Sequence, residues 1–327
     1  MVCVNPLAAL GLVEVEQDLA RLEPLLASSV ETGDAFLDEV TTHLIRAGGK
    51  RLRPLLGVAS ATSGDRAATE DDLMGAVSVE LVHLASLYHD DVMDEAEMRR
   101  NVESVNARYG NLVAIVAGDY LLARSAAIAA DLGTEIASVI AHTLALLTQG
   151  QVSEVRTAFS TARTRDDYYT AIGGKTAALM ATACRVGALT AERSRSEVEA
   201  LTVFGQSFGM MYQLRDDVLD VTATDGQLGK PAGQDLAEGI YTLPVLVALE
   251  DSVIGPELAE ILGQPLDEPE REKARALVEA SEGIAATVAE AHRFAEEARA
   301  ASEALPSASL AKGLVALGSL LLEDLPG

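Results

Sequence analysis

The chain of 327 residues contains no tryptophan, and aromatic side chains make up only 4% of it. It has two cysteines, Cys3 and Cys184, which lack metal-ligand spacing. So few cysteines argue against a disulfide framework and favour a reducing compartment, and we expect the cytoplasm. Basic residues number 25 against 50 acidic ones, for a formal net charge of −25. Nucleic acid is therefore excluded as an expected partner, because a phosphate backbone needs a basic surface.

Long uninterrupted apolar runs are also missing. The nearest one, residues 126–147, is broken by Asp131 and Glu135, so we expect no transmembrane segment. No basic segment precedes the first apolar residues, so we expect no signal peptide. The abundant alanine and leucine instead favour helices that pack closely on one another.

Helical periodicity runs through almost the whole chain, and no convincing hairpin signal interrupts it. We expect one all-α domain, residues 1–327, built as a single large bundle of antiparallel helices. Residues 222–239 predict an ordered loop, and residues 251–270, with three prolines, a surface connection. The expected helices are 14–29, 33–46, 54–63, 71–93, 110–130, 133–158, 165–190, 195–222, 240–250, 270–280, 283–303 and 306–322. Ser194 and Glu197 predict a capping box at the start of one of them.

Two clusters of the form D-D-x-x-D are the most informative feature of the chain. Carboxylates at positions i and i+4 lie on one face of a helix, where they repel each other unless a cation neutralises them. Two such clusters facing each other suit hard divalent cations, which in turn hold a phosphorylated ligand. The six carboxylates are Asp90, Asp91, Asp94, Asp216, Asp217 and Asp220.

Basic groups alternate with these clusters along the sequence. Arginine and lysine near a carboxylate cage are what a polyphosphate with Mg²⁺ requires. Two other interpretations fail. Gly173-Gly174-Lys175-Thr176 resembles the tail of a P-loop but lacks its first glycine. Glu80-x-x-His83 is typical of di-iron helical bundles, but no second copy exists.

Taken in order, these motifs resemble the trans-isoprenyl diphosphate synthases, or polyprenyl synthetases, over about residues 40–250. Order and spacing both agree, which is more specific than any single motif. The matching segments are G-G-K-R-L-R-P at 48–54, E-L-V-H at 80–83, D-D-V-M-D with R-R at 90–100, G-D-Y-L-L-A at 118–123, G-Q-x-x-E at 150–154, Tyr168 with Lys175-Thr176, Q-L-R-D-D-V-L-D at 213–220, G-K-x-x-G-x-D at 229–235 and T-L-P at 242–244.

The resemblance implies helices around a central cavity and a Mg²⁺-dependent prenyltransferase, expected from the family to be a homodimer. It would condense isopentenyl diphosphate with an allylic diphosphate in successive 1′-4 additions, releasing pyrophosphate. Cleavage of the C–O bond would leave an allyl cation, which needs an apolar pocket that excludes water. Pyrophosphate itself is a plausible acceptor of the final proton, since no protein base is obvious.

The resemblance also implies roles for individual residues. The Mg²⁺ ligands toward the allylic diphosphate would be Asp90, Asp94 and Asp216. The carboxylates that support them would be Asp91, Asp217 and Asp220. The cations that hold the same diphosphate would be Arg99, Lys175 and Lys230. The groups that bind the diphosphate of isopentenyl diphosphate would be Lys50, Arg53, His83 and Arg100. The oxygen dipoles near the developing carbocation would be Thr176 and Gln213.

Product length is a separate inference from this resemblance. Bulky residues four or five positions before the first aspartate block the product tunnel in the family, and here those positions hold the small Ser86 and Ala85. No phenylalanine, tyrosine or tryptophan occurs from 121 to 158, where neighbouring helices should line the tunnel. We therefore expect a long product, about C30 to C50, with a farnesyl or geranylgeranyl diphosphate synthase as the alternative.

Two further alternatives share the helical fold. A class I terpene cyclase would carry an Asn/Ser/Glu-type second metal motif, and a non-catalytic partner subunit would have lost aspartates or basic groups. The chain also departs from the family pattern in places. Asn101 replaces the glycine usual after the arginine pair, Ile240-Tyr241 replaces a common lysine, and the C-terminus lacks a basic residue found in some members.

Overall fold

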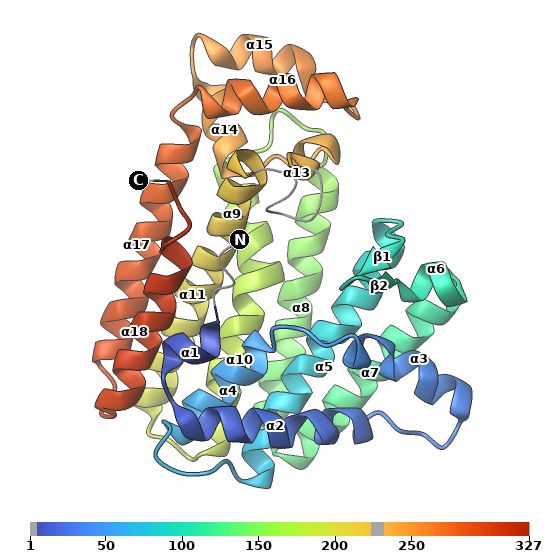
Figure 1. The fold of residues 1–327 in the computed structure, drawn as a ribbon, viewed down its shortest axis with the longest axis vertical. Helices are drawn as coiled ribbons and strands as arrows, with labels where there is room; N and C mark the ends of the chain where they lie inside the picture. Colours follow the sequence, from blue (N-terminus) through green and yellow to red (C-terminus); the bar gives the residue numbers. More distant parts are fainter. Residues whose placement is uncertain (1–4, 224–231, 327) are drawn as a thin grey trace.

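Helices dominate the computed structural model, which describes residues 5–223 and 232–326 (Figure 1). The all-α expectation is confirmed, because the strands within the described residues are only β1 (Met98–Arg99) and β2 (Val102–Glu103). The helices are α1 (Pro6–Leu10), α2 (Val13–Ser28), α3 (Ala35–Arg46), α4 (Leu52–Thr62), α5 (Glu70–Met93), α6 (Val105–Tyr109), α7 (Asn111–Asp131), α8 (Thr134–Thr157), α9 (Arg165–Ile172), the π-helical turn η1 (Gly173–Ala177), α10 (Ala178–Thr190), α11 (Arg195–Thr222), α13 (Gln234–Ala237), α14 (Leu243–Glu250), α15 (Ile254–Ile261), α16 (Glu268–Glu279), α17 (Gly283–Glu303) and α18 (Ala308–Leu322).

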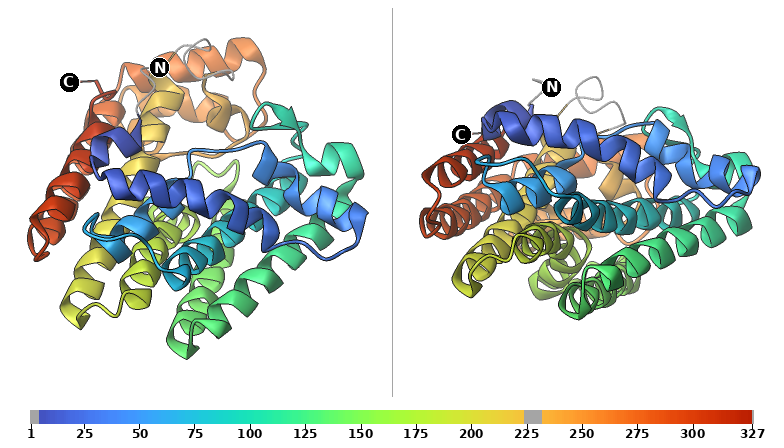
Figure 2. Two further views of the ribbon diagram at one scale, coloured as in Figure 1. Left: turned by 60° about the horizontal axis from the view of Figure 1, so that its bottom comes forward. Right: turned by 90° about the horizontal axis from the view of Figure 1, so that it is seen from below.

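Helix α10 lies at the centre of the bundle, packed against α4, α5, α8 and α11. On one side α5 packs against α7 and α7 against α8, while on the other α17 and α18 cover α11. Figure 2 shows α1 and α2 crossing one face of this bundle, where α2 contacts α4 and α5.

Small residues let the helix backbones approach closely in a core that is poor in aromatics. A Cβ on Gly187 of α10 would collide with the carbonyl oxygen of Gly57 in α4. The main buried core is built largely from leucine, valine and alanine of the long helices. A second, smaller core holds Tyr168 and Tyr241 with α14, α15 and α16. Alanine-rich helices therefore account for the dense packing predicted from composition.

The expected helix 165–190 is wrong in one respect, because η1 interrupts it at Gly173–Ala177. The widened turn fits a site where backbones meet, since a Cβ on Gly174 would lie 2.5 Å from the carbonyl oxygen of Leu146 in α8. A π-turn inserts one residue into helical spacing and commonly marks a functional site. Here it carries Lys175 and Thr176.

The structure also contains a hairpin that the sequence did not predict. Strands β1 and β2 are antiparallel and are joined through Arg100 and Asn101, with φ of 53° and 63°. Two left-handed residues in succession are typical of the tight hairpin turn that follows the twist of the strands. Asparagine tolerates this conformation, so Asn101 can stand where glycine is usual.

Other differences lie at the ends of elements and in connections. Helix α1 was not expected, and the predicted connection at 251–270 contains α15. In the predicted loop at 222–239, residues 224–231 lie outside the described residues and α13 follows them. The capping box at the start of α11 is confirmed, since Glu197 N–H donates to the Ser194 hydroxyl and Ser194 N–H to the Glu197 carboxylate.

Helix α7 is long and apolar enough to span a bilayer by length and composition. The sequence analysis expected no transmembrane segment and named residues 126–147 as the nearest apolar run. Only 39% of its apolar window is buried within the chain. Core helices of soluble proteins meet the same criteria, so α7 alone is weak evidence for a membrane span.

Candidate functional site

The first aspartate cluster lies at the C-terminal end of α5, where the helix dipole is negative and disfavours carboxylates. Desolvation raises the pKa of Asp90 to about 6, with Lys175 opposing the rise and Asp94 adding to it. The pKa of Asp94 is also raised, chiefly by desolvation. In this environment the ionised forms of Asp90 and Asp94 are disfavoured, and a bound cation would stabilise them.

Asp91 differs from its neighbours because it points into the protein and is fully buried. Arg99 of β1 donates to its Oδ1 from Nε and lies 2.6 Å from it through Nη2 as well. The hairpin is thereby fixed to α5 at the cluster. Through this pair with Asp91, Arg99 is held beside Asp90 and Asp94.

The second cluster lies near the C-terminal end of α11. Asp216 is partly exposed, and Arg215 donates to it at 3.1 Å. Asp217 is buried, accepting hydrogen bonds from Tyr168 at 2.5 Å and from Gln213 at 2.9 Å. Asp220 is buried too, and its carboxylate accepts from the backbone N–H of Asp235 at 3.2 Å.

The π-turn η1 brings the central lysine and threonine to both clusters. Lys175 forms an ion pair with Glu154 of α8, and both contribute to the electrostatics of Asp90 and Asp94. The Thr176 hydroxyl donates to Gln213 at 2.9 Å, so Thr176, Gln213 and Asp217 form a continuous chain of hydrogen bonds. Glu154 belonged to a motif in the sequence, but its pairing with Lys175 was not predicted.

A basic pocket lies around Glu80 and His83 of α5, about two to three helical turns before Asp90. Three arginines, Arg51, Arg53 and Arg100, act electrostatically on the buried Glu80. His83 lies one turn further along α5, and desolvation together with these arginines holds its pKa well below 6.5, so the imidazole is neutral at pH 7. The Nε of Arg53 is buried without a hydrogen-bond partner among the described residues. An anion would complete this pocket, which Lys50 flanks.

Arg100 makes backbone contacts that the sequence did not predict. Arg100 donates to the backbone carbonyls of Leu44 at 3.1 Å and of Gly48. A Cβ on Gly49 would lie 2.9 Å from the guanidinium carbon of Arg100, so only glycine leaves room for it there. Of the remaining predicted cations, Lys230 lies outside the described residues.

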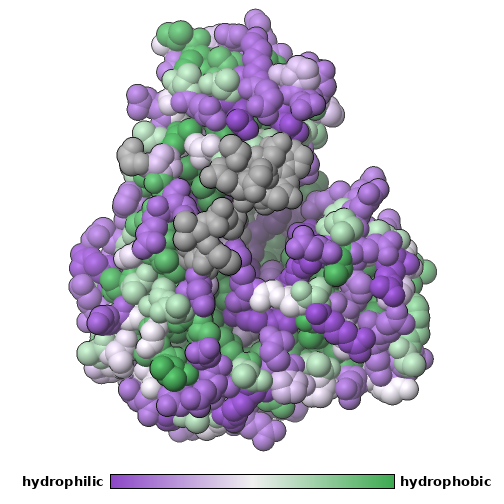
Figure 3. Space-filling view, viewed as in Figure 1, coloured by the Kyte–Doolittle hydropathy of each residue, from purple (hydrophilic) through white to green (hydrophobic). Residues whose placement is uncertain are grey.

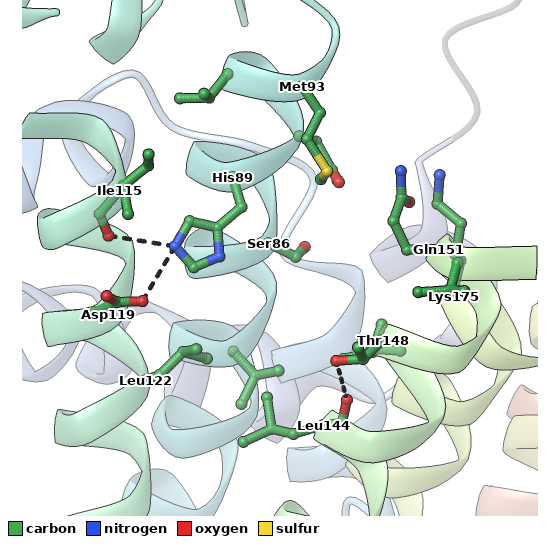
Figure 4. Close-up of a pocket in the computed structure, with 15 residues that line it drawn as sticks. Ser86, His89, Met93, Ile115, Asp119, Leu122, Leu144, Thr148, Gln151 and Lys175 are labelled. Atoms are coloured by element: carbon green, nitrogen blue, oxygen red, sulfur yellow. Dashed lines mark hydrogen bonds and ion pairs between the residues drawn. The ribbon is translucent and has the colours of Figure 1, made fainter. Parts of the chain in front are cut away.

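A cavity of about 510 Å³ runs from the aspartates into the bundle between α5, α7 and α8 (Figure 4). Lys175, Gln151 and Asp90 stand at its polar end, and its walls are mainly apolar. Its apolar lining consists of Val82, Val92, Met93, Ile115, Leu122, Leu144, Leu147 and Val152. The molecular surface is hollowed on the face that carries the hairpin, between hydrophilic side chains (Figure 3).

The two residues predicted to determine product length, Ala85 and Ser86, differ in their position relative to this cavity. Ser86 lines it, whereas Ala85 is fully buried in the hydrophobic core and does not. Consecutive helix residues point about 100° apart, and here this rotation places Ala85 in the core and Ser86 on the cavity wall. Among the described residues no phenylalanine, tyrosine or tryptophan lines the cavity, as expected from the sequence.

His89, to which the sequence analysis assigned no role, also lines this cavity. Its Nε2 lies 3.3 Å from the carbonyl oxygen of Ile115 and 3.4 Å from the Asp119 carboxylate on α7 (Figure 4). A Cβ on Gly118 would collide with the imidazole. The G-D pair of the motif at 118–123 thus accommodates and orients His89, a relationship between two motifs that only the fold reveals.

A second, smaller cavity of about 170 Å³ lies beside Lys175, Thr176 and Gln213. Arg163, which the sequence analysis missed, lines it while buried, and its Nη1 donates to the carbonyl oxygen of Tyr241 at 3.1 Å. Tyr241 itself is a core residue whose hydroxyl accepts from Gly263 N–H. Arg163 therefore supplies a cation near the position where the usual lysine is absent.

The donors fit Mg²⁺, which favours carboxylate oxygens. No group of three or more histidine, cysteine, aspartate or glutamate side chains stands ready to hold a metal ion anywhere in residues 5–223 and 232–326. Mg²⁺ is commonly held by one or two carboxylates together with phosphate oxygens and water, not by an all-protein cage. Asp90, Asp94 and Asp216 suit that mode because each keeps some exposure, whereas Asp91, Asp217 and Asp220 are buried.

Comparison with known proteins agrees with this geometry. The chain is 37% identical over 307 residues to the nonaprenyl diphosphate synthase of Mycobacterium tuberculosis, covering 93% of this chain and 91% of that protein. Its fold matches the decaprenyl diphosphate synthase of Rhodobacter capsulatus with a TM-score of 0.89 and 31% identity, covering 96% of this chain and 98% of the other.

A third similar structure is the polyprenyl synthase of Caulobacter crescentus complexed with calcium and isoprenyl diphosphate. It has a TM-score of 0.87 and 30% identity, and the match covers 95% of this chain and 96% of that one. The sequence model of the polyprenyl synthetase family matches residues 34–280. The chain therefore belongs to the polyprenyl synthetase family and is an all-α prenyltransferase.

Proposed function

We propose that this protein, acting as one catalytic domain, is a Mg²⁺-dependent synthase of a long all-trans polyprenyl diphosphate, about C30 to C50. It condenses isopentenyl diphosphate with an allylic diphosphate by successive 1′-4 additions and releases pyrophosphate. The observation that carries this proposal is the mainly apolar cavity of about 510 Å³ whose lining includes Asp90 of the first carboxylate cluster and Lys175. The names of the similar nonaprenyl and decaprenyl diphosphate synthases support it.

Bond cleavage needs stabilisation of the departing pyrophosphate. Mg²⁺ bound at Asp90, Asp94 and Asp216 would supply Lewis-acid charge to the diphosphate oxygens. Lys175 and Arg99 add fixed positive charge at the same end, and a prearranged cation is worth most in a desolvated site. Lys230 belongs to the same proposed set, by resemblance.

The allyl cation would form where the polar end of the cavity meets its apolar wall. The apolar side chains exclude water, which would otherwise capture the cation. Thr176 and Gln213 lie beside Lys175, where their oxygens favour positive charge nearby. Isopentenyl diphosphate would be held by Lys50, Arg53, His83 and Arg100, with its alkene directed to the cation.

The apolar depth of the cavity supports a long product. Small Ser86 leaves the path beside α5 open, and leucine and valine side chains form the rest of the wall. A shorter-chain synthase would need a bulky aromatic residue near this position, and no phenylalanine, tyrosine or tryptophan of the described residues lines the cavity.

We also propose that the protein is a homodimer that forms through α7 and α8. Leu112 and Val116 of α7 are 76% and 53% exposed, and Val152 and Val155 of α8 are 51% and 62% exposed. A contiguous apolar face of this kind usually marks an interaction surface. Covering it with a second copy would also account for the apolar character of α7, in keeping with a cytoplasmic enzyme.

The decisive experiment incubates the purified protein with labelled isopentenyl diphosphate, Mg²⁺ and one of several allylic diphosphates, followed by sizing of the products. We expect a long polyprenyl diphosphate, and none after chelation of Mg²⁺ or with Asp90→Ala. Turnover of an allylic diphosphate without isopentenyl diphosphate would instead indicate a terpene cyclase. Inactivity of the protein on its own would indicate a partner subunit.

A further inference from the structure

Arg51 holds together four segments that meet beside the basic pocket. Its Nε donates to Glu23 Oε1 at 2.6 Å and its Nη2 to Glu23 Oε2 at 3.0 Å, a bidentate pair with α2. Its Nη1 donates to Glu80 Oε1 of α5 at 3.0 Å, and its Nη2 also donates to the carbonyl oxygen of Ile45 at the end of α3. The Arg51 side chain is only 7% exposed. These contacts join α2, α3 and α5 to the start of α4.

The backbone at Arg51 needs such an anchor. Its φ of 47° and ψ of 36° lie in the left-handed region, and no side chain caps α4 there. A residue with a Cβ rarely adopts this conformation unless its surroundings impose it. The turn separates Lys50, which is exposed, from Arg53, whose Nε is buried without a partner among the described residues. The conformation of Arg51 therefore decides where both cations point.

Glu80 serves as the buried anion for this region. Its side chain is 2% exposed, and it acts on Arg51, Arg53 and Arg100. A carboxylate buried among several guanidinium groups offsets their mutual repulsion and keeps them close together. Glu23 is different, since its side chain is 46% exposed and it precedes the region 34–280 matched by the family.

We propose that Glu23 and Glu80 are positioning residues that act through Arg51 to shape the site for the diphosphate of isopentenyl diphosphate. This inference rests on the proposed function, in which Lys50, Arg53, His83 and Arg100 bind that diphosphate. The α2 helix is then part of the substrate site, although none of its residues contacts the substrate. Without the ion pair to Glu23, the left-handed turn at Arg51 is less constrained, and Lys50 and Arg53 are no longer held in position.

The test measures steady-state kinetics of Glu23→Gln with each substrate varied separately. We expect the KM for isopentenyl diphosphate to rise about five- to tenfold, with kcat and the KM for the allylic diphosphate changed less than twofold. A matched control is Glu135→Gln, because Glu135 is 43% exposed and also forms a bidentate pair, with Arg195, away from the site. This control should leave every parameter unchanged.

Further variants separate the possible failures. Arg53→Lys should raise the same KM, and combining it with Glu23→Gln should give less than the product of the two effects, since both act on one binding step. An unchanged KM with Arg53→Lys would overturn the site assignment. A normal KM with Glu23→Gln alongside an impaired Arg53→Lys would overturn only the positioning role.

Glu80→Asp, which keeps the charge, should retain more affinity for isopentenyl diphosphate than Glu80→Gln; the reverse order would also contradict the proposal.

Discussion

Tyr168 and Asp217 are separated by 49 residues in the sequence, yet the phenol donates a hydrogen bond of 2.5 Å to the carboxylate. Both side chains are buried, and the pKa of Tyr168 is raised well above 10 by desolvation and then by Asp217, so the phenol keeps its proton. With Gln213 on the other oxygen, Asp217 is held inside the protein. Its neighbour Asp216, in contrast, stays partly exposed.

The first prediction concerns the pH dependence of stability. Desolvation raises the pKa of Asp217 to about 7, whereas an aspartate in an unfolded chain titrates near 3.9. Between these values the folded protein binds the extra proton, so this carboxyl makes stability fall as pH rises. Asp217→Asn removes the titrating group, so the variant does not lose this stability as pH rises. Its melting temperature relative to wild type should therefore increase from about pH 5 to about pH 8, measured in a chelator.

A control for this prediction is Asp167→Asn at the start of α9. Hydrogen bonds from Thr164 lower the pKa of Asp167, so it is ionised throughout the same pH range in both states. Its stability difference from wild type should not change between these pH values. A gain for Asp217→Asn that shrinks as pH rises would contradict the raised pKa.

The second prediction concerns product length. Ser86→Phe should place a ring in the cavity and shift the product toward shorter chains, as measured by sizing of labelled products. Ser86→Ala should keep the wild-type length. The sequence suggested that Ala85→Phe would also shorten the product, but Ala85 lies in the core. We expect that variant to lose about 1–3 kcal/mol of stability through overpacking.

The third prediction concerns the C-terminal residues. Arg215 is buried and lies between Asp216 and Asp324, with which it forms ion pairs. Asp324→Asn removes a competing carboxylate, so Arg215 should hold Asp216 more strongly and oppose metal binding there. We expect the Mg²⁺ concentration for half-maximal activity to rise several-fold. The neighbouring Glu323→Gln should leave it unchanged, and an equal effect of both variants would point to general charge instead.

The fourth prediction concerns assembly. The double variant Leu112→Glu with Val116→Glu places two like charges on the exposed apolar face of α7, where burial of a charge is costly. It should sediment as a monomer under conditions in which the wild type sediments as a dimer. Val253→Glu is the control, because Val253 is 81% exposed on a different part of the surface. A wild-type protein that is monomeric at all concentrations would refute this interface.

Much of the fold could be predicted because helix formation depends on local sequence. The observed bounds of α11 and α17 agree with the expected 195–222 and 283–303. The hairpin was missed because Arg100 and Asn101 carry only a weak turn signal, and their conformation is fixed by contacts with distant residues. The π-turn was missed because it arises from close packing of Gly174 on α8.

The sequence by itself determined most of the long helices and the family, because residue types and their spacing are local properties. Only the tertiary structure decided which side chains meet. It set Asp217 apart from Asp216, put Ser86 but not Ala85 on the cavity wall, and joined Glu23 to Arg51. The physical reason is that direction and burial depend on how helices pack, and packing joins residues that sequence spacing keeps far apart.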